Sequence, residues 1–206
     1  MNRSSKKSGG PRLPLDAVML LVLVLAACGG GGGDASGGDG TPVATTPTTP
    51  TLPTTPVVTG TCDLPNFQQD LLTRINALRA AGATCGSSGT FPPTTALTWN
   101  SALATAADGH AQDMATKNYF SHDSQDGRSF SDRITAAGYS WSAAGENIAA
   151  GQANVEAVMN AWINSPGHCA NLMSANYVNV GVACRPAASS SNSYSKYWVM
   201  DLAKPR

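Results

Sequence analysis

The sequence predicts an α+β domain that follows an export signal and a linker. Apolar residues recur at helical spacing through much of the range 62–206, whereas two runs near the end alternate between apolar and small or polar residues as strands do. Helices and strands in mixed order are typical of a layered α+β domain. The range 62–206 is the size of one ordinary domain with a core of its own, and no internal repeat is visible.

Four helices are expected from apolar periodicity and from residues that begin or end helices. Their markers are Pro65 and Gly82 around the first, residues 100–117 for the second, a capping box at Ser129–Asp132 before the third, and Asn154 as the cap of the fourth. We expect Ser165-Pro166-Gly167 to stop the fourth helix. Met159, Trp162 and Trp198 are expected in the core, because such spacing is far more often packing than a ligand site.

Strands are expected toward the C-terminus. Residues 178–184 and 197–202 form two of them, and the Ser/Asn-rich segment 187–195 joins them as a long hairpin loop. A third strand is expected near residues 147–149.

The N-terminus predicts export and lipid anchoring. Its first twelve residues are basic, and the uninterrupted apolar core that follows, 17–27, is too short to span a bilayer, so residues 1–27 are interpreted as a signal peptide. Leu25-Ala26-Ala27-Cys28 resembles a lipobox, in which Cys28 carries the acyl chains that replace the apolar peptide as the membrane anchor. Gly29 after the cysteine favours sorting to the outer membrane.

Residues 28–61 are expected to form a lipidated cysteine followed by a disordered linker. The linker is rich in Gly, Thr and Pro and has too few apolar side chains to offset the entropy of ordering it. It would therefore tether the domain to the membrane.

Four further cysteines, Cys62, Cys85, Cys169 and Cys184, lie in the exported part, where disulfides are permitted. Of the three pairings that four cysteines allow, the sequence favours Cys62 with Cys85 and Cys169 with Cys184, because each closes a short local loop. No Cys-x-x-Cys spacing supports a metal site made by these cysteines. With 13 basic and 13 acidic residues the chain has no net charge and no basic stripe, so a nucleic-acid partner is not expected. Nothing demands an oligomer, so we expect a monomer.

Three histidines, one glutamate and one asparagine are the candidate site residues. His110 projects from the second helix, His122 follows that helix in a loop, and His168 follows the Pro-Gly turn. Glu146 and Asn147 enter an apolar stretch. Imidazole is a common metal ligand and general base, which makes these positions candidates for chemistry.

Six segments in order resemble the signature of the CAP superfamily of secreted cysteine-rich proteins, in its bacterial SCP-like branch. They are Phe120-Ser121-His122, Gly145-Glu146-Asn147-Ile148-Ala149, Trp162 with Ser165-Pro166-Gly167-His168, Asn171-Leu172-Met173, Val180-Gly181-Val182 and Tyr197-Trp198. The resemblance covers nearly all of residues 64–203.

The resemblance implies an α-β-α sandwich, with helices on both faces of a small antiparallel sheet, and a central cleft. In relatives this cleft carries two histidines and two acids, sometimes with zinc or another divalent metal. His122 and His168 match the histidines, and Glu146 matches one acid. The second acid is replaced here by Ser165, so the metal set would be His122, His168 and Glu146 alone. His110 has no place in that tetrad.

Several interpretations of the site remain open. Glu146 and Asn147 can be structural, with a buried glutamate bonded to a histidine. His110 can be a satisfied histidine on a helix face. The leading expectation is a non-enzymatic binding module for a small apolar or lipid ligand or a cell-envelope partner, with possible help from a metal. The alternative is a metal-dependent hydrolase that acts on peptide or cell-wall material with Glu146 as base. A third is an interaction protein that uses only its outer loops.

Overall fold

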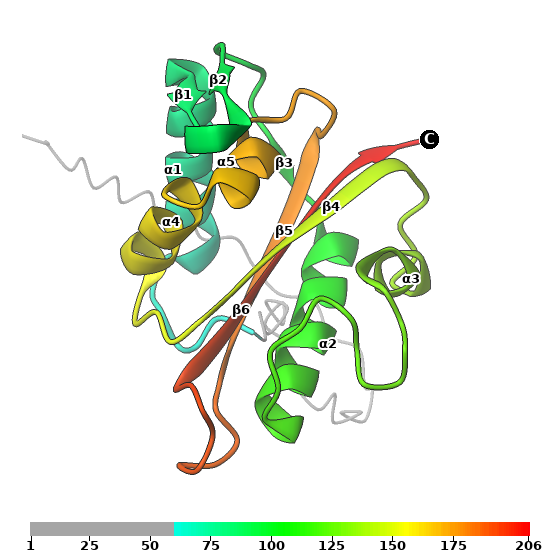
Figure 1. The fold of residues 1–206 in the computed structure, drawn as a ribbon. Coiled ribbons are helices and arrows are strands. Elements are labelled where there is room, and N and C mark those ends of the chain that lie inside the picture. Colours follow the sequence, from blue (N-terminus) through cyan, green and yellow to red (C-terminus); the bar gives the residue numbers. More distant parts are fainter. Residues whose placement is uncertain (1–59) are drawn as a thin grey trace, which may run out of the picture. The chain divides into compact units, whose positions relative to one another are not determined.

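The computed structural model describes residues 60–206 (Figure 1). The predicted signal peptide, Cys28 and all but the last two residues of the predicted linker lie outside this range. Within residues 60–206 no helix combines the length and the apolar character that a membrane crossing requires.

The described chain contains helices and strands in mixed order. In sequence they are α1 (Phe67–Ala81), β1 (Ala83–Thr84), the 3₁₀ turn η1 (Gly86–Ser88), β2 (Thr90–Phe91), β3 (Thr98–Trp99), α2 (Ser101–Lys117), α3 (Phe130–Ala136), β4 (Trp141–Ala150), α4 (Val155–Ile163), α5 (Pro166–Met173), β5 (Asn179–Pro186) and β6 (Lys196–Pro205).

A four-stranded sheet with the strand order β3-β5-β6-β4 forms the middle layer. Strand β6 is antiparallel to both of its neighbours, β4 and β5, as expected. The two-residue β3 runs parallel to β5, so the sheet is mixed and not purely antiparallel. The direction of β3 is not fixed by a tight turn, since four helices and the strand β4 separate it from β5 along the sequence.

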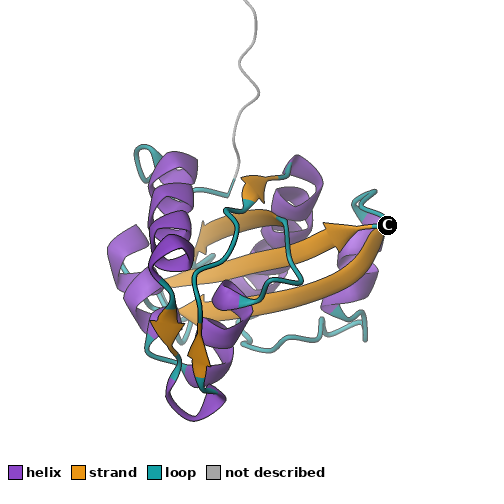
Figure 2. Cartoon of the chain, turned by 90° about the horizontal axis from the view of Figure 1, so that it is seen from above, coloured by secondary structure: helices purple, strands orange, loops and turns teal. Residues whose placement is uncertain are grey.

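Helices cover both faces of this sheet (Figure 1 and Figure 2). α1, α4 and α5 lie on one face, and α2 and α3 lie on the other. The expected α-β-α sandwich is therefore confirmed.

The predicted helix boundaries agree closely with the structure. The Asn100 side chain caps α2, the Asn154 side chain caps α4, and Ser129 with Asp132 forms a complete capping box before α3. One helix was not predicted: Pro166 does follow the end of α4, but it also occupies the first turn of α5. His168 therefore lies in a helix and not in a turn.

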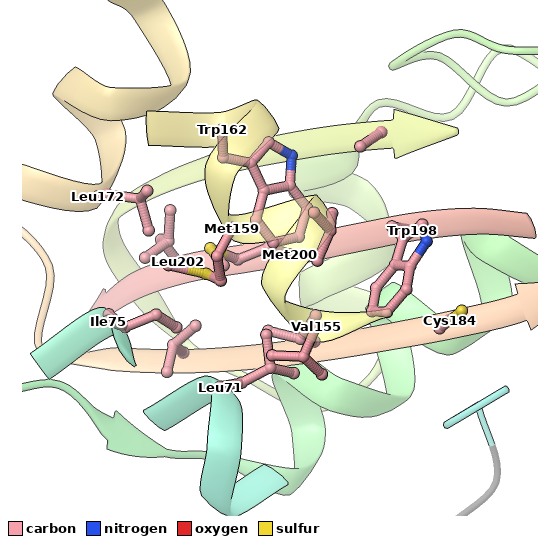
Figure 3. Close-up of a cluster of buried hydrophobic side chains, with 14 of the residues drawn as sticks. Leu71, Ile75, Val155, Met159, Trp162, Leu172, Cys184, Trp198, Met200 and Leu202 are labelled. Carbon is pink, nitrogen blue, oxygen red and sulfur yellow. The ribbon is translucent and has the colours of Figure 1, made fainter. Parts of the chain in front are cut away.

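The main core lies between the sheet and the α1–α4–α5 layer (Figure 3). Trp162 of α4 and Trp198 of β6 are fully buried there, and Met159 is 1% exposed, as the sequence predicts. Each indole N–H donates to a backbone carbonyl, Trp162 to Ile148 at 3.3 Å and Trp198 to Gln152 at 3.0 Å, so neither ring leaves a buried donor unpaired.

Close packing of α2 against the opposite face depends on Gly181 in β5. A Cβ atom at this position would collide with the backbone of Leu103 and Ala104 in α2. The absence of a side chain lets the helix axis approach the sheet, which brings the polar residues of α2 close to those of β4 and β6.

The structure pairs the four cysteines differently from the sequence-based preference. Cys62 is bonded to Cys184, and Cys85 is bonded to Cys169. The prediction of two local loops is wrong, because the fold brings distant segments together: the chain at Thr61 pairs with β5 at Cys184, and η1 packs on α5. Sequence separation could not show either contact.

Candidate functional site

The candidate residues meet at β4, which is an edge strand of the sheet. Alternate residues of a strand face opposite sides, so Glu146 points toward the α2–α3 layer and Asn147 points toward α5. Both residues are almost completely buried, with Glu146 5% exposed as a whole residue and Asn147 not exposed at all. The two neighbours therefore connect the site to both layers of the sandwich.

The outer edge of β4 is covered by side chains instead of another strand. Three of its carbonyl groups accept hydrogen bonds at 3.3 Å, from Tyr177 to Ala144, from Asn171 to Glu146 and from Trp162 to Ile148. These donors occupy backbone carbonyl groups that could otherwise pair with a strand of another chain.

Glu146 is held by two cationic groups at once. One carboxylate oxygen accepts from Nδ1 of His122 at 2.7 Å, and the other accepts from Nη2 of Arg133 at 2.7 Å. The Glu146 and Arg133 side chains are 1% and 4% exposed, whereas the His122 side chain is 50% exposed. The arrangement places a buried ion pair behind a histidine that reaches solvent.

Arg133 also fixes the loop that carries His122. Its guanidinium donates to the backbone carbonyls of His122 at 2.9 Å and Arg128 at 3.0 Å, and to the hydroxyl of Ser124 at 3.1 Å. α3 supplies this arginine and begins at a capping box, so a short helix is sufficient to hold it. Arg133 was not predicted as a site residue. The only feature of the sequence that points to it is its position directly after the capping box.

The environment raises the pKa of the His122 imidazole. The main cause is its hydrogen bond to Glu146, which favours the protonated ring and outweighs the partial burial. The protonated form of the half-exposed His122 ring is therefore favoured more than that of a free histidine.

His168 lies in α5. Its pKa is lowered, mainly by burial and secondarily by the positive charge of His122. The backbone carbonyl of the same residue accepts from Asn147 Nδ2 at 3.1 Å, and Asn171 Nδ2 donates to Asn147 Oδ1 at 2.9 Å. Asn147 thus joins β4 to the first turn of α5 and sets the position of His168. Asn171 was part of the sequence motif but had not been assigned a role.

His110 is completely buried in α2 and does not reach the surface. Its Nε2–H donates to the carbonyl oxygen of Ser121 at 2.8 Å, so the histidine on the helix holds the residue before His122. Burial lowers the pKa of His110, and the neutral ring leaves Nδ1 without a hydrogen-bond partner within residues 60–206. The structure places His110 in a supporting position behind the exposed histidine.

A second buried acid, Asp201 in β6, lies directly opposite Glu146 in the β4–β6 pairing. The residue is not exposed, neither carboxyl oxygen has a hydrogen-bond partner within the described chain, and burial followed by the nearby Glu146 charge raises its pKa well above the usual value. Asp201 was not predicted as a site residue, because it stands inside an apolar strand and is not part of any of the six motif segments.

The donor set does not fit the family's metal site. Both oxygens of Glu146 are engaged, and Ser165 stands where the second acid is expected. No group of three or more His, Cys, Asp or Glu side chains within residues 60–206 is arranged to hold a metal ion. Among the predicted ligands, Nε2 of His122 is not used by the hydrogen bond to Glu146, and the ring of His168 makes no hydrogen bond to Glu146.

Three surface hollows of the domain lie away from these residues. The largest, about 390 Å³, is lined by the start of α1, a second of about 240 Å³ lies between α2 and α3, and a third of about 290 Å³ lies near the C-terminus. Arg133 borders the second hollow, but His122, Glu146 and His168 border none of the three. The candidate site has the half-exposed His122 at the surface and the buried ion pair of Glu146 and Arg133 behind it.

Comparison with known families gives one match that spans most of the domain. The model of the cysteine-rich secretory protein family, CAP, matches residues 72–202, which is more than half of the chain. Every candidate residue from His110 to His168 lies inside the matched range.

Two curated relatives come from Bacillus subtilis. The uncharacterized protein YkwD is 44% identical over 80 residues, which cover 39% of this chain and 31% of YkwD. The uncharacterized membrane protein YlbC is 38% identical over 86 residues, which cover 42% of this chain and 25% of YlbC. The matched segment therefore spans less than a third of either relative.

Two solved structures resemble the fold. An extracellular protein with an SCP domain from Bacillus anthracis is 29% identical with a TM-score of 0.54, and the match covers 66% of this chain and 39% of that one. An outer surface protein of Borrelia burgdorferi has a TM-score of 0.55 at 20% identity, with 68% of this chain and 95% of that one covered. The second likeness concerns the fold alone.

Proposed function

This chain belongs to the cysteine-rich secretory protein family, CAP, and from that premise we propose that it is an exported, lipid-anchored binding module that carries out no hydrolysis. Its ligand would be a lipid or another cell-envelope component, recognised at the edge of β4. The observation that carries the proposal is the state of Glu146: its side chain is 1% exposed and bonded on both oxygens, so it serves as a buried counter-charge and offers no free base.

The exposed partner of Glu146 suggests the charge of the ligand. His122 presents a cationic ring at the surface, and its Nε2–H is free of the Glu146 contact. Such a ring favours an anionic head group, and the head group of a fatty acid or an acidic lipid would supply it. His168, with its lowered pKa, would add a neutral ring beside the charge.

Location outside the cytoplasm is supported by three independent features. The sequence contains a predicted signal peptide, the domain has two disulfides, and a similar structure at 29% identity comes from an extracellular protein. We propose that acylation of Cys28 holds the domain at the membrane through the linker. Metabolic labelling with palmitate should mark the native chain and not C28S. Equal labelling of both chains would contradict the anchor.

Binding at the β4 edge is tested with dodecanoate as the probe. Calorimetric titration of the purified chain should show binding, and His122→Ala should weaken it about tenfold, as expected for the loss of one charged hydrogen bond. Lys117→Ala is the matched control, because Lys117 is a comparably exposed cation, with 44% of its side chain exposed, that pairs with Asp113 and not with the site. Equal losses in the two variants would show that only overall charge matters.

The hydrolase alternative has its own measurement. Zinc titration of the native chain and of the double variant His122→Ala/His168→Ala, together with cleavage assays on peptidoglycan and casein, separates the two functions. Zinc-dependent cleavage that is lost in Glu146→Gln would overturn the binding-module proposal. We expect no cleavage with or without zinc.

A further inference from the structure

Two aromatic side chains stand out on the surface of the domain. Phe120 and Tyr194 are 44% and 40% exposed, and they are the large apolar residues of the described chain, 60–206, that lie open to solvent. They come from different loops, yet their ring centres are 5.7 Å apart. The Tyr194 ring also packs edge-on against the buried Tyr197, with centres 6.0 Å apart. The two rings therefore form one patch that rests on the core.

Hydrogen bonds fasten the two loops to each other. The Asn118 side chain, at the end of α2, accepts from the Ser193 amide at 2.9 Å and from the Tyr197 hydroxyl at 3.2 Å. The Asn192 side chain donates to the carbonyl of Ala115 at 2.6 Å. The hairpin loop that carries Tyr194 is thus attached to the loop that carries Phe120, and the rings are held in place before any partner arrives.

The chain around the patch is neutral and rich in hydroxyl groups. Residues 118–121 and 187–195 contain no charged side chain, and the second range includes five serines and one asparagine. Serine and asparagine supply adaptable hydrogen bonds, and tyrosine supplies a rigid surface at small cost in conformational entropy. This composition fits a neutral polar partner, and within these two ranges no cation is present that would attract an acidic lipid surface or nucleic acid.

From these observations we infer that Phe120, Tyr194 and the serine-rich loop form a binding surface for a neutral glycan. The C–H face of a sugar ring packs on an aromatic face, whose electron density is negative, while the sugar hydroxyls bond to serine and asparagine. Two half-exposed rings supply only a small part of the about 800 Å² that each partner buries in a stable protein–protein interface. The inference does not depend on ligand binding at His122, because it rests on different side chains.

The experiment uses chitohexaose, a neutral oligosaccharide, as the probe and the purified full chain with Cys28→Ser as the protein. Calorimetry should detect binding to this chain. Phe120→Ala/Tyr194→Ala should bind at least about tenfold more weakly, whereas Tyr194→Phe, which keeps the ring, should stay within about twofold. Thr73→Ala, at an exposed position of α1 outside the proposed surface, is the control with both rings and the loop intact. No binding by the parent chain, or equal binding by the double alanine variant, would overturn the inference.

A second variant separates sugar stacking from insertion into a membrane. Phe120→Leu/Tyr194→Leu keeps apolar bulk but removes both flat rings. Under the glycan inference this variant loses chitohexaose binding, and it and the parent chain float with phosphatidylcholine vesicles no more than Phe120→Ala/Tyr194→Ala does. Greater flotation of these two chains than of the double alanine variant, together with undiminished sugar binding by the leucine variant, would overturn it. Circular dichroism and a thermal melt of each variant show that a loss of binding is not a loss of fold.

Discussion

Glu146 and Asp201 face each other across the β4–β6 ladder, with both carboxyl groups buried on the α2–α3 side of the sheet. Opposed residues of antiparallel strands have Cβ atoms about 5 Å apart, so two negative charges here would repel strongly. Of these two acids, only Glu146 forms hydrogen bonds with Arg133 and His122. The geometry therefore favours the protonated form of Asp201, whose pKa is raised by burial and by the nearby Glu146.

Replacement of Asp201 by asparagine should stabilise the domain at neutral and higher pH. The pKa of Asp201 is raised in the folded state, so its contribution to stability is fully present below the unfolded value of about 3.9 and is lost as pH rises through the folded pKa. Urea unfolding of the native chain and Asp201→Asn should therefore agree near pH 4 and separate at pH 8. Asp126→Asn, at an exposed position, is the control. A native chain that is the more stable one at pH 8 would contradict the prediction.

Removal of the guanidinium that balances Glu146 should strongly destabilise the fold. Arg133→Leu leaves a buried carboxylate without its main partner and also removes donors from two backbone carbonyls, so we expect a loss of about 3–5 kcal/mol in the free energy of unfolding. Because the penalty comes from the unpaired charge, Arg133→Leu/Glu146→Gln should recover part of it. Urea denaturation measures both. If the double variant is no more stable than the single one, the ion pair is not the cause.

The sequence predicted most of the fold because its signals are local. Capping residues at Asn100, Ser129 and Asn154 mark helix starts through hydrogen bonds within a few residues, and alternation marks the strands through the period of the backbone. The α5 helix was missed because one Pro-Gly pair both follows one helix and begins the next. Nothing in the sequence suggests two helices in succession there.

The candidate site could be predicted only in part. The resemblance singled out His122, Glu146 and His168, but Arg133 and Asp201 come from α3 and β6, and only the pairing of strands and the packing of helices bring them to Glu146. The predicted disulfide pairing was wrong for the same reason. Cys62 and Cys184 are 122 residues apart, and they meet because Thr61 pairs with β5 at Cys184.

The long loops closed by the observed disulfides predict large effects on stability. Loop-entropy reasoning gives about 4–5 kcal/mol for each bridge, given separations of 122 and 84 residues, in contrast to about 3 kcal/mol for the short loops expected from sequence. Cys62→Ala/Cys184→Ala and Cys85→Ala/Cys169→Ala should each lower the urea midpoint substantially. Mass spectrometry of unreduced peptides checks the pairing itself. Peptides that join Cys62 to Cys85 would contradict the structure.

The free energy of unfolding should depend on pH through the His122–Glu146 hydrogen bond. The pKa of His122 is raised in the folded state, so its bond to Glu146 contributes stability that is fully present below the unfolded value of about 6.5 and is lost as pH rises through the folded pKa. Burial lowers the pKa of His110, so His110 affects stability in the opposite direction: stability falls as pH drops below about 6.5, because only the unfolded chain takes up the proton readily.

Native and His122→Gln chains, compared by urea unfolding from pH 8.5 to pH 5, should therefore diverge on the acidic side, with the variant the less stable. His122 is half exposed, so solvent screens the effect and the difference should be smaller than that of Arg133→Leu. Parallel curves over the whole range would show that the His122–Glu146 contact does not stabilise the fold.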